Sequence, residues 1–465
     1  MSVERRDQQK MTLKTNTHQA YNSQDGGQKK LVPSPSDERY LNWNLRIGLR
    51  AQDKAALFSN LMKHFNKEVF HEAYQALKGK RALGVDKVSK AQYGKKLEQN
   101  LEDLVKRVQS GRYRPLPKRE VLIPKANGKT RPIAIASFED KLVDWVAGEI
   151  LSQIYEPLFI KNSFGYRPNK SADGAIKACY YSMEKNKRPN VVEIDFSNFF
   201  NTIPHRKMMK ILERRIPDKR FLGLIMRLLS GEIRKSTGET LPSEIGTPQG
   251  GIASPILANI YLNEVVDQWF IENYASYNNI IVRYADDAVF FFRKEDEAKD
   301  FIDALNERVK MYGLVLNRDK THQLKLDKDS KEHFHFLGFT FYWGKQGKKK
   351  MFKLKTQKTK LHKGLKEFDH WIKDNRNRKK LSVLWELAEA KIRGHVNYYG
   401  YGMNNTKVHH FYSAAINSLF KWLNRRSQKR SYDWEGFQER IRNFPLLPAQ
   451  DQIKWKQLGR YACQP

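Results

Sequence analysis

Three acidic residues stand where β-forming runs of the sequence end or turn. Asp195 follows the run VVEI, and the pair Asp286-Asp287 separates the runs 280–284 and 288–292. Carboxylates about 4 Å apart repel one another by roughly 4 kcal/mol at an effective dielectric constant of about 20. Divalent cations relieve this repulsion, and Mg²⁺ binds one or two carboxylates together with phosphate oxygens. The aspartates therefore predict a site where Asp195 and Asp286 share two Mg²⁺ ions, with Mn²⁺ as a substitute, for phosphoryl transfer.

The chain must fold so that these carboxylates meet. In VVEIDF, alternation places the apolar residues on one face of a strand and Glu193 with Asp195 on the other. The two β-rich runs around Asp286-Asp287 leave no long loop between them, so we expect a hairpin that presents both carboxylates. Taken alone, an aspartate such as Asp195 is more often a solvated carboxylate at the end of a strand.

Two other segments carry turn and helix-start signals. In EVLIPKANGKTRPIAIA an Asn-Gly pair lies between β-forming runs, which predicts a hairpin with Lys125 and Arg131 near its tip on opposite arms. In TPQGGIASPILANIYL a glycine-rich turn precedes an apolar helix, for which we expect Ser254 as N-cap and Pro255 as the first helical residue.

Composition points to a polyanionic partner. The chain has 465 residues, with 85 Lys plus Arg against 51 Asp plus Glu, a net charge of +34 and a pI near 9.9. Such charge suits phosphate binding, although solubility alone is the alternative explanation. Two cysteines exclude a disulfide framework or a four-cysteine zinc site. Without a long apolar run or a signal-peptide pattern, we expect a soluble, cytoplasmic protein that does not bind membranes.

The sequence changes in texture along its length. Residues 1–37 are polar and basic with few large apolar residues, which predicts a disordered tail. An apolar stripe at helical spacing follows from Trp43 to Leu77. Beyond about residue 345 the chain is rich in Lys and Arg with helical periods, which indicates a separate basic helical module.

Taken jointly, these motifs resemble group II intron-encoded reverse transcriptases and maturases, of the kind that lack an endonuclease. The resemblance runs from about residue 40 to 435 and rests on YADD (284–287), TPQGGIASPILANIYL (from 247), IPKANGKTRPIAI (from 123), SFGYRPNKSA (from 163), FLGF (336–339) and GHVNYYGYG (from 394). Only about 30 residues follow Trp434, with one cysteine and no histidine, so a Cys/His-based nuclease module is not expected.

The resemblance implies an α+β fold of the right-hand polymerase class, with an antiparallel palm sheet and a helical thumb or maturase domain. The implied divisions are a disordered basic tail (1–37), an N-terminal extension with helical fingers (38–115), fingers and palm (116–345), the thumb or maturase domain (346–435) and a C-terminal tail (436–465).

It also implies roles for individual residues. Asp195, Asp286 and Asp287 match the catalytic, metal-binding carboxylates. Lys125, Arg131, Phe200 and Gln249 match residues around the incoming nucleotide, and Phe336, Leu337 and Gly338 match the primer grip. From the residues alone, Lys125 and Arg131 could be ordinary surface charges and Phe200 a core residue.

The implied activity is RNA-directed DNA polymerisation, with maturase assistance to intron splicing and mobility. Its partners would be an RNA template, a DNA primer, dNTPs and group II intron RNA in a bacterial cytoplasm. A related enzyme recruited to phage defence or spacer acquisition, and a non-catalytic RNA-binding maturase, are the alternatives. Three positions depart from the family pattern: Asn201, Ala253 and His395.

Overall fold

In the computed structural model, the described residues are 42–79, 81–124, 130–184, 188–275, 278–426, 432–446 and 455–458. The chain divides into two compact units, residues 1–46 and 47–465. The described part of the first unit is residues 42–46, which contain the start of helix α2 (Trp43–Arg50). The tail predicted at 1–37, Lys125 and the predicted Asn-Gly turn all lie outside the described residues.

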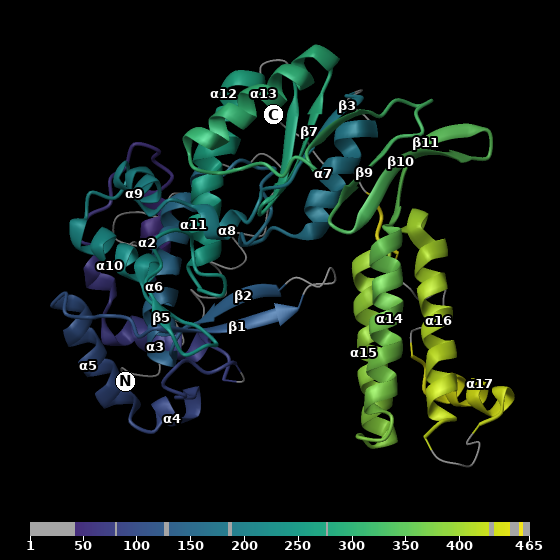
Figure 1. Cartoon of the computed structure of the whole chain (residues 1–465), viewed down its shortest axis with the longest axis horizontal. Coiled ribbons are helices and arrows are strands. Elements are labelled where there is room, and N and C mark those ends of the chain that lie inside the picture. Colours follow the sequence, from purple (N-terminus) through teal and green to yellow (C-terminus); the bar gives the residue numbers. More distant parts are fainter. Residues whose placement is uncertain are drawn as a thin grey trace, which may run out of the picture. The chain divides into compact units, whose positions relative to one another are not determined.

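A four-stranded antiparallel sheet, here called the central sheet, carries the predicted carboxylates. Its order is β6-β7-β3-β8, and Figure 1 shows β3 and β7 side by side. Its strands are β3 (Asn190–Ile194), β6 (Ile280–Tyr284), β7 (Asp287–Phe292) and β8 (His322–Lys325). Strands β6 and β7 pair from Ile280 opposite Phe291 to Tyr284 opposite Asp287, so the predicted YADD hairpin is confirmed.

Helices and a second sheet cover the two faces of the central sheet. On one face, Phe290 and Phe292 pack against Phe301 of α13 (Glu295–Met311), with ring centroids 4.5 and 5.1 Å away. On the other face, Val289 and Phe291 join a buried cluster with α7 (Ala172–Glu184) and the second sheet. The alternation of strand residues therefore buries the central sheet on both sides.

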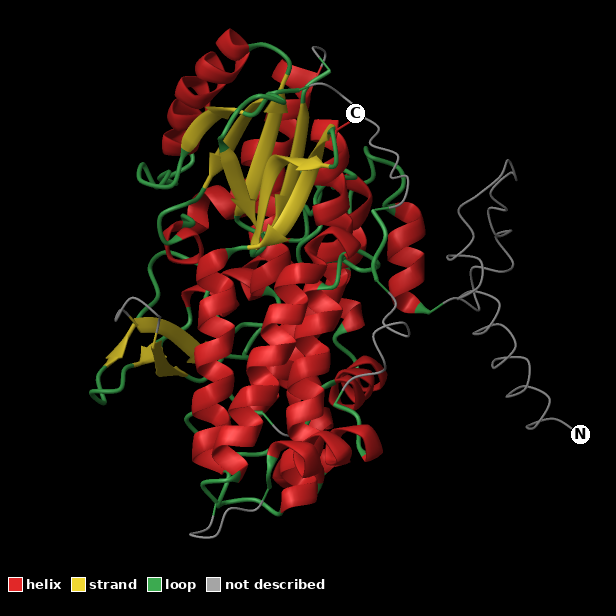
Figure 2. Cartoon of the chain, turned by 90° about the vertical axis from the view of Figure 1, so that its right-hand side faces the viewer, coloured by secondary structure: helices red, strands yellow, loops and turns green. Residues whose placement is uncertain are grey.

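The second sheet has the order β11-β10-β9. Its antiparallel strands are β9 (His333–Phe336), β10 (Phe339–Gln346) and β11 (Lys349–Thr356). Leu337 and Gly338 form the turn between β9 and β10, with φ of 48° and 80°. In Figure 2 the strands fall into two groups, and the larger group holds the central and second sheets.

A smaller sheet, the hairpin sheet, has the order β2-β1-β4-β5. It consists of β1 (Lys118–Pro124), β2 (Thr130–Ile135), β4 (Ile233–Arg234) and β5 (Thr240–Leu241). Strands β1 and β2 are antiparallel, with Pro124 opposite Thr130. The two arms of the predicted basic hairpin are therefore confirmed.

Helices before the YADD hairpin pack around these sheets. They are α3 (Lys67–Ala76), α4 (Lys90–Gly94), α5 (Leu97–Gln109), α6 (Phe138–Tyr155), α8 (Phe199–Thr202), α9 (His205–Glu213), α10 (Lys219–Ser230), α11 (Ser254–Leu262) and α12 (Trp269–Tyr274). A π-helical segment, Asn263–Gln268, joins α11 to α12. Single 3₁₀ turns occur at Leu61–His64, Glu156–Leu158 and Gly402–Asn404.

The start of α11 differs from the sequence-based expectation. The N-cap is Ala253, and Ser254 is already the first helical residue. The hydroxyl of Ser254 donates to the carbonyl of Pro248 at 2.8 Å instead of accepting a helix N–H group. The prediction of Ser254 as N-cap is therefore wrong, because this serine closes the glycine-rich turn. Gly148 of α6 lies against Ala253, which explains the small side chain at 253.

The C-terminal region is helical, as expected. It contains α14 (Lys358–Asn375), α15 (Leu381–Tyr399), α16 (Asn405–Leu423) and α17 (Trp434–Asn443), and α14 and α16 lie close together (Figure 1). His395 stacks on Phe411 with ring centroids 3.5 Å apart, and burial lowers the pKa of His395 to about 4. His395 is therefore a neutral, partly buried side chain packed between α15 and α16.

Residues near the end of the described chain pack back on the fold. Lys456 bridges Tyr401 in parallel register, and Tyr181 of α7 donates its hydroxyl to the carbonyl of Leu458 at 2.5 Å. Helix α17 lies across the boundary predicted at residue 435. Within the described residues, no helix is long and apolar enough to cross a membrane.

Candidate active site

The structure brings the three predicted carboxylates to one edge of the central sheet. Strand β3 pairs with β7 so that Ile194 lies opposite Ala288. Extending this register by one residue places Asp195 opposite Asp287, and Asp286 precedes Asp287 in the β6–β7 turn. Strand ends that are 91 residues apart in sequence therefore present their carboxylates together.

The carboxylates raise one another's pKa values, as expected from their mutual repulsion. Loss of surrounding water and the charges of Asp286 and Asp195 raise the pKa of Asp287 to about 6, although its side chain keeps contact with solvent. Burial and the charge of Asp195 also raise the pKa of Asp286. The site therefore holds more negative charge than its surroundings balance, and a cation would relieve it.

Two side chains that follow α13 neutralise part of this charge by contacting Asp195. The ammonium group of Lys320 lies 3.0 Å from Asp195 Oδ2, and Asn317 Nδ2 donates to the same oxygen at 3.2 Å. The backbone N–H of Asn317 donates to the Asp195 carbonyl at 2.8 Å. From the residues alone, the segment LNRDKT gives no signal for either residue beyond its charge. The family resemblance matches Lys320 to a lysine near the palm edge and leaves its role open.

The carboxylates suit divalent cations, although they do not surround a metal position on all sides. Among the described residues, no three His, Cys, Asp or Glu side chains converge into a preformed metal cluster. Mg²⁺ needs only one or two carboxylates, because water and substrate phosphates complete its shell. The chemistry of Asp195 and Asp286, hard oxygen ligands under mutual repulsion, suits this mode, and Lys320 already supplies a positive charge there.

Backbone hydrogen bonds hold the loop of Gln249 to Phe200 on one side and to β2 on the other. Thr247 N donates to the Phe200 carbonyl at 2.6 Å, and Ala134 N of β2 donates to the Gln249 carbonyl at 2.7 Å. Both side chains are half-buried, and the Phe200 ring packs edge-on against Phe199 at 5.4 Å. The loop of Gln249 thus connects the hairpin sheet to α8, and Phe200 is not a fully buried core residue.

A cavity of about 410 Å³ opens beside this loop. Its lining comes from β2, α8 and the loop before α11, and includes Ala134, Asn201, Ile245, Gly246 and Gln249. Asn201, one of the three departures from the family pattern, therefore lies on the wall of this cavity.

Arg131 lies on β2 with an exposed side chain. Its positive charge lowers the pKa of Asp286, although burial raises that pKa by more. It also acts on the phenol of Tyr166, a residue of the SFGYRP segment whose pKa is raised by burial and by Asp286. The structure therefore places Arg131 and the previously unassigned Tyr166 within electrostatic reach of the carboxylates.

The predicted primer-grip residues divide into core and surface. Phe336 is 3% exposed and belongs to the cluster beneath the sheets, so its side chain is not available to a ligand. The turn residues Leu337 and Gly338 are half-buried, and Tyr398 of α15 donates its hydroxyl to the Leu337 carbonyl at 2.9 Å. Strand alternation turns the Phe336 side chain inward, and the assignment of the three residues to the primer grip stays a prediction.

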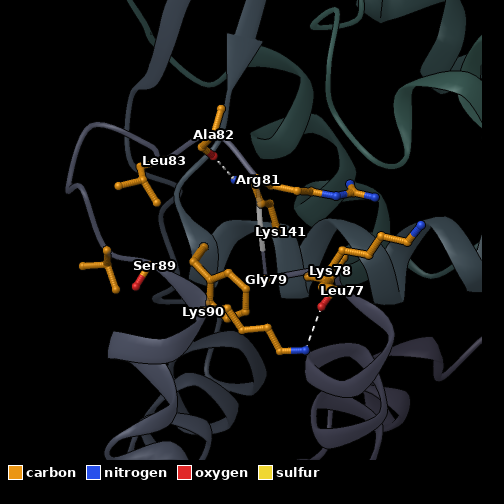
Figure 3. A pocket seen from close by; sticks show the side chains of 11 residues that line it. Leu77, Lys78, Gly79, Arg81, Ala82, Leu83, Ser89, Lys90 and Lys141 are labelled. Carbon is orange, nitrogen blue, oxygen red and sulfur yellow. Dashed lines mark hydrogen bonds between the residues drawn. The ribbon is translucent and has the colours of Figure 1, made fainter. Parts of the chain in front are cut away.

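A small pocket beside segments 77–79 and 81–90 offers no comparable site (Figure 3). Its volume is about 10 Å³, room for about one water molecule. Lys90 donates to the Leu77 carbonyl at 2.7 Å and Lys141 to the Ala82 carbonyl at 2.9 Å. These lysines hold the loop backbone in place.

One stretch of the chain matches a known protein family. Residues 123–341 match the family model described as Reverse transcriptase (RNA-dependent DNA polymerase). This range includes the central sheet, all three carboxylates and the hairpin sheet from Ile123 onward. This stretch of the chain is therefore similar to reverse transcriptases, and the expected right-hand polymerase fold with an antiparallel palm sheet is confirmed.

The relatives to which this chain is similar include proteins encoded in introns. The Group II intron-encoded protein LtrA of Lactococcus lactis subsp. cremoris is 30% identical over 223 residues, 47% of this chain and 37% of that protein. Protein YkfC of Escherichia coli K12 is 38% identical over 203 residues, 43% of this chain and 52% of that protein. An uncharacterized 91 kDa protein in the cob intron of Schizosaccharomyces pombe is 34% identical over 220 residues, 47% of this chain and 26% of that protein.

These matches confirm the resemblance to group II intron-encoded reverse transcriptases. The chain spans about half or less of the length of these relatives.

Proposed function

We propose that the protein is an RNA-directed DNA polymerase that extends a primer on an RNA template with dNTPs. The observation that carries this proposal is the meeting of Asp195, Asp286 and Asp287 at one edge of the central sheet. In this assignment the central sheet is the palm, the hairpin sheet belongs to the fingers, and α14, α15 and α16 form the thumb.

Asp195 and Asp286 would hold two Mg²⁺ ions, and Asp287 would complete the carboxylate set. Bound there, the ions would activate the primer 3′-hydroxyl and stabilise the charge that develops on the phosphates. The chain itself keeps Asp195 in place through Asn317, whose backbone and side chain both bond it. Lys320 balances the charge of Asp195 before metal and substrate enter.

The surrounding residues would select and orient the nucleotide. Arg131 and Lys125 would bind the triphosphate, Arg131 through its planar guanidinium group and Lys125 as a point charge. Gln249 would line the nucleotide pocket, and the half-buried ring of Phe200 would exclude a 2′-hydroxyl by its bulk. Leu337 and Gly338 would contact the primer. The backbone bonds that tie Phe200 and Gln249 into one loop system support this joint role.

RNA is the proposed macromolecular partner, both as template and as a group II intron. The net charge of +34 supports binding to a polyanion, because each neutralised phosphate releases counterions. The intron-encoded relatives support a second role as maturase in splicing and mobility. The C-terminal helices, with many exposed cations, would supply part of the RNA-binding surface.

Primer extension tests the polymerase proposal directly. Wild-type protein should extend a DNA primer on an RNA template with dNTPs only when Mg²⁺ or Mn²⁺ is present, and should use rNTPs poorly. Asp286→Asn keeps the size of the side chain and removes its charge, so it should extend no primer above background. Extension by this variant at the wild-type rate would refute the proposal. Intron splicing by a wild-type protein that extends nothing would instead favour a non-catalytic maturase.

A further inference from the structure

A fully buried arginine donates a hydrogen bond to the backbone of the β6–β7 turn. The side chains of Arg283 and Asp267 are both 0% exposed. The guanidinium donates from Nε to Asp267 Oδ1 at 2.7 Å and from Nη2 to Asp267 Oδ2 at 2.5 Å. Its Nη1 donates at 2.9 Å to two further acceptors, Asn259 Oδ1 and the carbonyl of Ala285. Arg283 therefore reaches the backbone of the turn that carries two carboxylates.

The turn that receives this bond has an unfavourable backbone conformation. Ala285 has a φ of 57°, in the left-handed region that residues with a Cβ rarely adopt. Gly165 packs so closely against it that a Cβ there would lie 2.4 Å from Ala285 N. Asn259, which accepts from Arg283, also donates to the Gly165 carbonyl at 2.7 Å. Such a conformation persists only where the surroundings hold it from several sides.

An irregular helix supplies the partner of Arg283. Asp267 lies in the π-helical segment Asn263–Gln268 between α11 and α12. π-Helical turns are rare and occur frequently at functional sites. The wider turn changes which residues face the central sheet, and here Asp267 faces Arg283.

Stability alone is a weak reason for this network. Apolar residues of similar volume often replace a buried ion pair with no loss of stability, whereas removing one partner leaves a buried charge unpaired. The bond from Arg283 to Ala285 is the feature that an apolar pair could not reproduce.

We propose that Arg283 is a positioning residue for metal binding: oriented by Asp267 and Asn259, it fixes the Ala285 carbonyl and so the direction of Asp286 and Asp287. This inference rests on the proposed function of those carboxylates. Groups that orient metal ligands from the second layer typically change metal affinity by about 10- to 100-fold when removed.

Metal binding and catalysis together test this role. The double variant Arg283→Met/Asp267→Leu removes both charges and should fold, with a melting temperature near that of the wild type. We expect its Mn²⁺ dissociation constant, measured by electron paramagnetic resonance on the full chain, to rise about tenfold or more. The Mg²⁺ concentration for half-maximal extension should rise in parallel, while the KM for dNTP should change little.

A conservative variant separates positioning from charge pairing. Arg283→Lys keeps a positive charge beside Asp267, but one ammonium group does not reproduce the planar fork that reaches Asp267, Asn259 and Ala285 at once. A purely structural ion pair would be rescued by lysine, whereas the proposed role predicts weakened Mn²⁺ binding in a folded protein. This variant also decides the matter if the double variant fails to fold.

Arg215 provides a matched control. It is 6% exposed and donates to the carbonyls of Asp53, Ala56 and Ile154, none of which belongs to the carboxylate turn. Arg215→Met should lower the melting temperature and leave the Mn²⁺ dissociation constant of the folded protein unchanged.

The outcomes separate the two proposals. Wild-type Mn²⁺ binding in a folded Arg283→Lys or double variant would overturn the positioning role while extension by the wild-type chain still supported the polymerase. If replacing Arg283 weakens Mn²⁺ binding but the wild type extends no primer, the polymerase proposal fails and the positioning role stands.

Discussion

The central sheet and the hairpin sheet support the candidate site in different ways. The central sheet is buried on both faces, and the turn that carries Asp286 is bonded from behind by the buried side chain of Arg283. The β1–β2 hairpin extends outward, with Leu122 and Ile123 near its tip 46% and 45% exposed, and Arg131 exposed on the facing strand. One region is fixed by packing and the other is largely in solvent.

This difference matches the demands of the proposed chemistry. Metal ligands must keep their geometry within a few tenths of an ångström, which favours a rigid sheet with a supported turn. Groups that bind a triphosphate and release pyrophosphate must let substrate enter and product leave, and such segments come from the less stable parts of a fold. We therefore expect substitutions in the central sheet to act on the rate and substitutions in the hairpin to act on nucleotide affinity.

After the loss expected for Asp286→Asn, the largest effect should follow from Asp195→Asn. This variant removes one metal-binding carboxylate and the ion pair with Lys320, so we expect kcat for primer extension to fall by about 10² to 10³. Steady-state extension measured against Mg²⁺ concentration checks the result. Asp303→Asn, at an exposed position on α13, is the control and should retain the wild-type rate. A loss limited to twofold would mean that Asp195 is only a strand-end carboxylate.

A smaller effect of another kind should follow from Arg131→Ala. Hydrogen bonds to charged groups contribute about 1.5 to 3 kcal/mol, so the KM for dNTP should rise about tenfold or more while kcat changes little. Single-nucleotide extension across a dNTP series measures both quantities. Arg234→Ala removes an exposed arginine from another strand of the same sheet and should change neither. If Arg131→Ala instead lowered kcat alone, the proposed contrast between the two sheets would be wrong.

The elements of the site follow from local sequence patterns. Alternation in VVEIDF predicted that Asp195 leaves the end of a strand, and the short gap around Asp286-Asp287 predicted a hairpin; both depend on neighbours in the chain. That these strand ends are neighbours depends on sheet order, which the residues alone do not specify and which the family resemblance supplied.

Other features depend on contacts between distant segments. Lys320 meets Asp195 across 125 positions of sequence, and nothing in LNRDKT distinguishes this lysine from a solvated one. The bond of Ser254 to Pro248 displaced the predicted helix cap. The pairing of Arg283 with Asp267 depends on a π-helical segment, which has no reliable signature in sequence.

The smallest expected effect is on thermal stability. It shows whether the Asp287 carboxylate destabilises the fold by repulsion or stabilises it by its contacts. The folded-state pKa of Asp287 is raised from 3.8 to about 6, so its protonated form favours folding and its charged form opposes it. The wild type should therefore lose more stability than Asp287→Asn as pH rises from about 4 to above 6. Without metal at pH 7.5, this variant should melt on the order of 1–3 °C above the wild type, and the difference should disappear near pH 4.

Adding Mg²⁺ should stabilise the wild type more than the variant, because the cation relieves the same repulsion. Thermal melts across this pH range, with and without Mg²⁺, provide the measurement. A variant that melts below the wild type at pH 7.5 would show instead that the Asp287 carboxylate supports the turn through its contacts, and that the central sheet is not under electrostatic strain at this edge.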